Sequence, residues 1–220
     1  MEIGSDPDLV ERVIVNGFYY TWPIDAGFRK DSDYVDFMVE SMAKFYPDLD
    51  NYRDENGDVT PRYKLHAGMA FYISEIKIDI LMTQDQVMPN EYTGGFNDSS
   101  TAYKLTIHSK YGAETTFLML GDSHNGVCNK LMGKYSYDVL HTNFFMSLHH
   151  GGNDCTNFFK FICPDYLIYT SGSKVTSKTG YAWLNANCLG YVTNGISLTI
   201  TEDGYDFKKI NSAASIVFNS

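Results

Sequence analysis

The stretch Leu118-Met-Leu-Gly-Asp-Ser-His-Asn125 is apolar until a glycine and an aspartate end it. Further along the chain, Leu148-His-His-Gly-Gly152 places two histidines just after another apolar segment. A side chain at the point where a strand leaves a sheet stands on a rigid scaffold and still faces a cleft, and α/β proteins build sites there. The two stretches therefore predict an α/β fold in which a carboxylate and imidazoles meet at a sheet edge.

The segments on both sides of these stretches alternate between strand and helix patterns. Strands are predicted at residues 13–15, 70–73, 76–81, 102–108, 115–120, 144–148, 165–170, 196–200 and 205–210. Helices are predicted on apolar stripes that begin at Val35, Val127, Cys155 and Tyr181. The polar residues 84–99 are predicted to form a loop. Because strands and helices alternate after Asp122, we expect an α/β layer with helices packed on a mixed sheet.

Length and composition predict one domain over residues 1–220. With 44% hydrophobic residues, the chain can bury a substantial core. No apolar run approaches the about 18 residues that a membrane helix needs, and no secretory signal opens the chain. The formal charge of −10 makes a nucleic-acid backbone an unfavourable direct partner. We expect the acidic excess to form a solvated surface.

The four cysteines show none of the close pairing that zinc fingers and redox motifs require. Cys128 and Cys155 fall on the apolar stripes of predicted helices, where a thiol behaves as a small hydrophobic group. The cysteines are therefore expected to be reduced and structural, which favours a cytoplasmic setting.

Aspartate and histidine at the two stretches suit a divalent metal ion. Both are ligands for borderline ions such as zinc, manganese and iron, and one aspartate can bridge two ions. A structural alternative stays open on spacing alone, because Gly-Asp turns are common and many histidine pairs have structural roles.

A third motif sets these two in a longer pattern. Asn97-Asp-Ser-Ser100 is followed by a predicted hairpin, then by Gly121-Asp122 and a helix, and then by His149-His-Gly-Gly152 and another helix. This order resembles the C-terminal half of a metallo-β-lactamase-fold hydrolase, over roughly residues 65–172. The branch that it resembles includes phosphorylcholine-esterase-like enzymes and the soluble domain of competence DNA-uptake proteins. The resemblance implies an αββα sandwich of mixed sheets, here N-terminally truncated.

The resemblance also implies roles for individual residues. Asp122 resembles the carboxylate that bridges two metals, and His150 is favoured over His149 as a terminal ligand. His149 would then contact the substrate phosphate or orient the site. Asn97 and Ser99 match the loop motif, where they would contact substrate or hydrogen-bond the loop to itself.

One departure from the family pattern is large. The family's first metal motif, His-x-His-x-Asp-His, is missing, since none of the six histidines has that spacing. His124 is expected in the first turn of the following helix, facing solvent, with a role as replacement ligand as the alternative. Met1-Glu-Ile-Gly-Ser5 resembles the tail of the missing motif, although an unrelated capped helix start is the other interpretation.

The expected function follows from the resemblance and from this shortage of ligands. A complete relative would use zinc or manganese to hydrolyse a small-molecule phosphoester. This chain offers two ligands where a catalytic zinc needs about three, so we expect weak or absent metal binding and little activity. The alternatives are a non-catalytic interaction domain that keeps the fold, and an unrelated α/β domain. Loss of early strands would expose apolar sheet surface, which favours a homodimer.

Overall fold

The computed structural model describes residues 18–20, 53, 56–59, 62–83, 86, 96–170, 178–193, 195–212 and 214–218. The chain divides into two units, Met1–Leu65 and His66–Ser220. In the first unit, β1 (Phe18–Tyr20) pairs in parallel with β2 (Arg62–Lys64). The strand predicted at residues 13–15 and the helix predicted from Val35 lie outside the described residues. The expectation of one domain over residues 1–220 stays a prediction.

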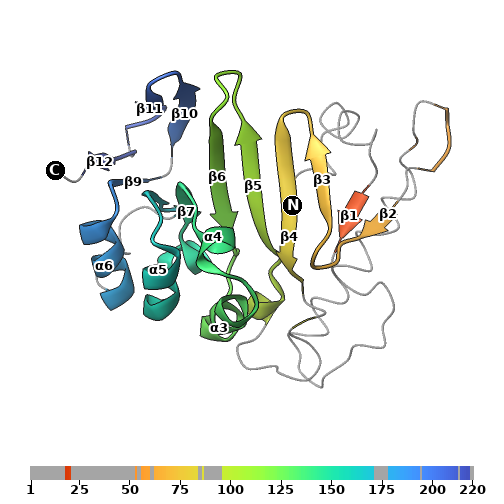
Figure 1. Ribbon diagram of the computed structural model, residues 1–220, viewed down its shortest axis with the longest axis horizontal. Coiled ribbons are helices and arrows are strands. Elements are labelled where there is room, and N and C mark those ends of the chain that lie inside the picture. Colours follow the sequence, from red (N-terminus) through yellow and green to blue (C-terminus); the bar gives the residue numbers. More distant parts are fainter. Residues whose placement is uncertain are drawn as a thin grey trace. The chain divides into compact units, whose positions relative to one another are not determined.

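The second unit is built on an eight-stranded mixed sheet with the order β12-β9-β8-β7-β6-β5-β4-β3 (Figure 1). Its strands are β3 (Ala70–Ile73), β4 (Ile76–Met82), β5 (Ala102–His108), β6 (Glu114–Met119), β7 (Phe144–Met146), β8 (Tyr166–Ile168), β9 (Gly190–Val192) and β12 (Ile216–Phe218). Neighbours from β3 to β6 are antiparallel, those from β6 to β9 are parallel, and β12 is antiparallel to β9. The predicted mixed α/β fold is confirmed.

Helices connect the parallel strands, because a parallel pair needs a long crossover between its strands. The α-helices of this unit are α3 (Asn125–Lys134), α4 (Tyr137–Leu140), α5 (Thr156–Ile162) and α6 (Thr179–Asn187). Two short 3-10 helices, η3 (Phe96–Ser99) and η4 (Leu148–Gly151), precede β5 and follow β7. No helix in the described ranges is long and apolar enough to cross a bilayer.

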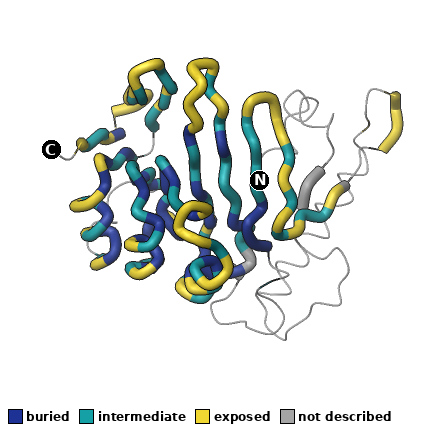
Figure 2. The backbone as a smooth tube through the Cα atoms, in the orientation of Figure 1, coloured by how far each residue is buried: buried dark blue, intermediate teal, exposed yellow. Residues whose placement is uncertain are grey.

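Helix α5 packs on one face of the sheet through aromatic side chains. The ring of Phe145 in β7 lies 6.2 Å from that of Phe158 and 5.6 Å from that of Phe159, both in α5. All three side chains are buried, and Figure 2 shows buried positions along β7 and α5. Burial of each such ring stabilises the fold by roughly 1.5–3 kcal/mol.

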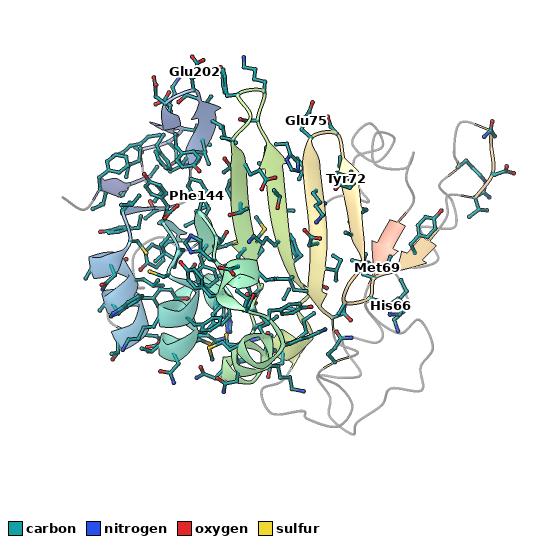
Figure 3. The ribbon with its side chains drawn as sticks, viewed as in Figure 1. His66, Met69, Tyr72, Glu75, Phe144 and Glu202 are labelled. Atoms are coloured by element: carbon teal, nitrogen blue, oxygen red, sulfur yellow. The ribbon has the colours of Figure 1, made fainter. Side chains whose placement is uncertain are left out.

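The other face carries a row of stacked rings across three strands. Phe144 stacks on Phe117 at 4.7 Å and on Tyr166 at 5.2 Å between ring centroids. The closing hairpin, β10 (Ile196–Thr201) and β11 (Gly204–Lys209), covers this row. Its Tyr205 ring meets Phe144 edge-on at 4.8 Å, in the region where Figure 3 labels Phe144. Rings on both faces of β7 fix the register of the parallel strands, because a shift of one residue would exchange the faces.

The four cysteines, all of them among the described residues, form no disulfide bond with one another. Cys128 on α3 and Cys155 at the N-cap of α5 are buried, as their places on apolar stripes predicted. Burial raises the pKa of the Cys128 thiol well above its usual range, and Cys155 beside it adds to the shift. These two thiols are core groups.

Candidate functional site

The two stretches that contain Asp122 and the histidine pair lie at one end of two adjacent strands. Phe117 and Leu118 of β6 pair in parallel with Phe144 and Phe145 of β7. Parallel neighbours end at the same sheet edge, so the residues that follow them share that edge. Strand β7 stops at Met146, whereas the sequence predicted a strand to residue 148, because the chain turns there into η4.

Gly121 makes the turn that presents Asp122. Its φ of 56° is left-handed, a conformation that glycine adopts without steric cost. A Cβ at this position would lie 2.8 Å from Oγ of Ser100, whose hydroxyl accepts a 3.1 Å hydrogen bond from the Asp122 backbone N–H. The close approach of Ser100 therefore requires glycine at position 121 and fixes the backbone of Asp122.

Backbone and side-chain hydrogen bonds join the aspartate loop to the histidine loop. The His149 backbone N–H donates to the Gly121 carbonyl at 3.1 Å. The Asn153 side-chain amide donates to the carbonyls of Asp122 and Ser123, each at 2.9 Å. These bonds hold the two loops side by side. Asn153 is a site residue that the sequence pattern did not identify.

His150 is the imidazole nearest to the Asp122 carboxylate. Its Nε2 lies 3.7 Å from Asp122 Oδ1, and its Nδ1 lies 3.2 Å from Oγ1 of Thr170. Two ligand bonds of about 2.1 Å at a roughly tetrahedral angle would span about 3.4 Å, which is close to this separation. An oxygen that holds the other ring nitrogen is typical of metal-bound histidine. The pair therefore fits two positions of a divalent-ion site.

His149 is held by Asn97, a residue that the loop motif selected. The His149 Nδ1 lies 3.3 Å from Nδ2 of Asn97. If this amide donates to Nδ1, the ring carries its proton on Nε2 and can donate a hydrogen bond to a bound anion. Ser99 lies in η3, and its side chain is outside the described part. Its neighbour Ser100 makes the contact to the aspartate loop.

His149 and His150 both adopt a left-handed backbone, with φ values of 45° and 52°. Left-handed non-glycine residues cost about 1–3 kcal/mol each and cluster at functional sites. At position 152 a Cβ would lie 2.8 Å from the His149 carbonyl oxygen, so the tight turn also explains Gly152. The rest of the fold compensates for a strained loop that presents two adjacent imidazoles.

The structure corrects the prediction for His124. It is the N-cap residue that precedes α3, and its side chain is 33% exposed where a solvent-facing ring was expected. Its ring Nδ1 lies 3.0 Å from Oδ1 of Asp98, and its backbone N–H donates to the same oxygen at 2.8 Å. Asp98 comes from η3, far away in sequence, so local pattern gave no signal for this pair.

The ligands gathered at this edge are fewer than a closed metal site requires. Among the residues that the structure describes, no three His, Cys, Asp or Glu side chains stand close enough to hold an ion as they are. The Asp122 and His150 pair supplies two positions, and the nearby rings of His124 and His149 lie 6.1 Å apart between centroids.

A cavity of about 370 Å³ lies away from this edge, lined by residues that include Met69, Lys77, Asp79 and Lys104. Its charged groups already have partners. Lys77 pairs with Asp79 at 2.9 Å, and Lys104 donates to the carbonyls of Val139 and His141. The cavity contains none of the candidate site residues, and its lysines are already held by Asp79 and by two backbone carbonyls.

No protein-family model matches this chain, and no curated protein or solved structure does so either. The chemistry of the site therefore rests on the residues at the shared sheet edge. Asp122, His149 and His150 meet there, as the sequence predicted, together with Asn97.

Proposed function

We propose that this chain is the C-terminal portion of a metal-dependent hydrolase of the metallo-β-lactamase superfamily that acts on a phosphoester. The observation that carries the proposal is the 3.7 Å separation between His150 Nε2 and Asp122 Oδ1 at the ends of two parallel strands. An oxygen and an imidazole nitrogen in this arrangement match the ligand preferences of zinc and manganese. The αββα sandwich and the phosphoester class come from the motif resemblance and are part of the proposal.

Each site residue has a chemical task in this proposal. Zinc or manganese, when bound, supplies a water whose pKa falls from about 15.7 toward about 7. Asp122 and His150 hold the ion, and the Thr170 hydroxyl keeps the His150 ring turned toward Asp122. His149 donates a hydrogen bond to a phosphate oxygen, and Asn97 holds its ring for that task.

The ligand shortage limits the activity that we propose for the chain by itself. The sequence has no His-x-His-x-Asp-His run, which in relatives supplies most ligands. Two ligands on loops leave an ion with weak support, so the isolated chain is expected to hydrolyse phosphoesters slowly. A polypeptide that contributes the missing ligands would raise both metal affinity and rate.

A non-catalytic binding domain is the second candidate. The observation that favours it is the lack of three convergent ligand side chains in the described residues. Such a domain would keep the sheet edge and its histidines as a recognition surface without metal chemistry. The homodimer and the cytoplasmic setting expected from the sequence belong to either candidate as proposals.

Calorimetric titration with zinc and manganese, followed by an assay with bis(p-nitrophenyl) phosphate, tests the first candidate. We expect Asp122→Asn and His150→Ala each to weaken metal binding at least tenfold and to remove the metal-dependent rate. His108→Ala is the matched control, since His108 lies at the opposite end of β5. Metal binding that is unchanged in Asp122→Asn and His150→Ala would exclude the hydrolase proposal and favour the binding domain.

A further inference from the structure

We propose that His124, positioned by Asp98, is a third protein ligand of the divalent ion at Asp122 and His150. This inference rests on the proposed function and adds a ligand to it. The sequence-based expectation of weak metal binding counted two ligands, whereas a third would bring the set to the number that catalytic zinc sites use.

The first support is the burial of the Asp98 carboxyl group. Asp98 is 2% exposed, and its Oδ2 has no hydrogen-bond partner among the described residues. A buried carboxylate is costly unless nearby positive charge or hydrogen bonds compensate it. A cation bound to the far side of the His124 ring would supply that charge through the imidazole.

The second support is the way in which the His124 ring is held. One carboxylate oxygen of Asp98 lies 3.0 Å from the ring Nδ1 and accepts the His124 backbone N–H at 2.8 Å. In the neutral ring that donates from Nδ1, the Nε2 lone pair is available as a ligand. The carboxylate-histidine arrangement is the one that orients metal-bound histidines and raises their basicity.

The third support is the direction of the chain around Ser123. The Ser123 side chain is fully buried and its hydroxyl donates to the Leu120 carbonyl at 2.6 Å. The residues on both sides of it, Asp122 and His124, remain partly exposed at 37% and 33%. His124 has an extended backbone, in which alternate side chains point to the same side. The inward turn of Ser123 thus leaves both potential ligands on the outer side.

The fourth support is the arrangement of the imidazoles. The His124 and His149 rings lie 6.1 Å apart at 85°, and the His149 and His150 rings lie 6.2 Å apart at 67°. His150 in turn lies beside Asp122. The four side chains therefore follow one another along a single rim.

Cobalt titration of the whole chain, followed by visible absorption and calorimetry, tests the third ligand without an activity assay. His124→Phe keeps a ring of similar size and removes both nitrogens, while Asp98→Asn keeps the shape and removes the charge. We expect His124→Phe to weaken cobalt binding about 10- to 100-fold and to change the ligand-field absorption, and Asp98→Asn to weaken binding at least several-fold. His108→Phe is the control and should bind cobalt as the wild type does.

The outcomes separate this inference from the proposed function. Cobalt affinity and spectrum that stay unchanged in His124→Phe, while Asp122→Asn loses binding, would remove His124 from the ligand set and leave the hydrolase proposal intact. A wild-type chain with no measurable cobalt binding overturns the third ligand. Unchanged binding in Asp122→Asn overturns both. Circular dichroism establishes that each variant is folded, and His124→Phe decides alone if Asp98→Asn does not fold.

Discussion

Asp98 binds His124 twice through one oxygen, at 2.8 Å from the backbone nitrogen and 3.0 Å from the ring Nδ1. His124 occupies the N-cap of α3, yet its own side chain makes no capping hydrogen bond. A carboxylate from η3 therefore accepts the backbone N–H of the N-cap residue of α3, the helix that begins after the Gly-Asp turn. This link ties the loop before β5 to the loop after β6 and makes the sheet edge one structural unit.

Removal of the Asp98 carboxylate should destabilise the fold. Asp98→Ala leaves the His124 backbone N–H without its partner in a partly buried place, which costs about 1–3 kcal/mol. Urea unfolding measures the change, and Asp203→Ala at an exposed turn is the control with an expected change below about 0.5 kcal/mol. Equal unfolding midpoints for the two variants would contradict a structural role for the Asp98 link.

Gly121→Ala should disturb both stability and metal binding. Its left-handed backbone costs an L-residue about 1–2 kcal/mol, and the new Cβ would also press on Ser100. Gly112→Ala is a matched control, because Gly112 has a φ of 83° and no atom within 4 Å of the place that a Cβ would occupy. Only Gly121→Ala is expected to lower zinc affinity, since Ser100 accepts the Asp122 backbone N–H. A similar loss of zinc affinity in both variants would show that Gly121 has no specific role at the site.

Tyr181→Phe should destabilise the start of the histidine loop at Leu148. The buried Tyr181 hydroxyl accepts the Leu148 backbone N–H at 2.9 Å and donates to the Leu148 carbonyl at 3.3 Å. Loss of this hydroxyl leaves the buried Leu148 backbone N–H unpaired, at a cost of about 1–3 kcal/mol. Thermal unfolding tests the loss against Tyr111→Phe, which changes a residue that is 43% exposed. Hydrogen exchange at Leu148 that stays as slow as in the wild type would count against this role of Tyr181.

The buried thiols predict a loss of stability at alkaline pH. Burial raises the pKa of Cys188 to about 12 from an ordinary value of 9.0. The unfolded thiol therefore ionises first, so its contribution to stability is complete below pH 9 and is lost as the pH rises toward 12. Urea unfolding between about pH 8 and 10.5 should show falling stability, with a smaller slope in Cys188→Ala. An identical slope in the two proteins would exclude Cys188 as a source of the pH dependence.

Much of the secondary structure followed from local pattern. The predicted strand at residues 70–73 coincides with β3, and the hairpins at 102–120 and 196–210 are present as β5–β6 and β10–β11. Alternating side chains and turn residues are local properties, so the sequence of a single strand or hairpin is enough to show them. The strands and the α-helix that were missed, β1, β2, α4, β9 and β12, have three or four residues each. Elements of that length are too short to show a period.

The candidate site divides in the same way. The sequence selected Asp122, His149 and His150 because each follows an apolar strand, and the structure brings these residues together. The sequence offered no reason to connect Asp98 with His124. That contact joins segments on either side of a hairpin, and its partners are set by the packing of η3 against the start of α3.

Within the described residues, the sequence by itself determined the longer strands, the helices on the apolar stripes from Val127, Cys155 and Tyr181, and the polar residues that end two of the strands, because these depend on neighbours along the chain. Only the tertiary structure decided that β6 and β7 lie side by side. It also decided that Asp98, Asn97 and Thr170 contact the ring nitrogens of His124, His149 and His150, respectively. The physical reason is that parallel pairing and side-chain hydrogen bonds between distant segments arise from the packing of helices on the sheet. No local pattern encodes those partners.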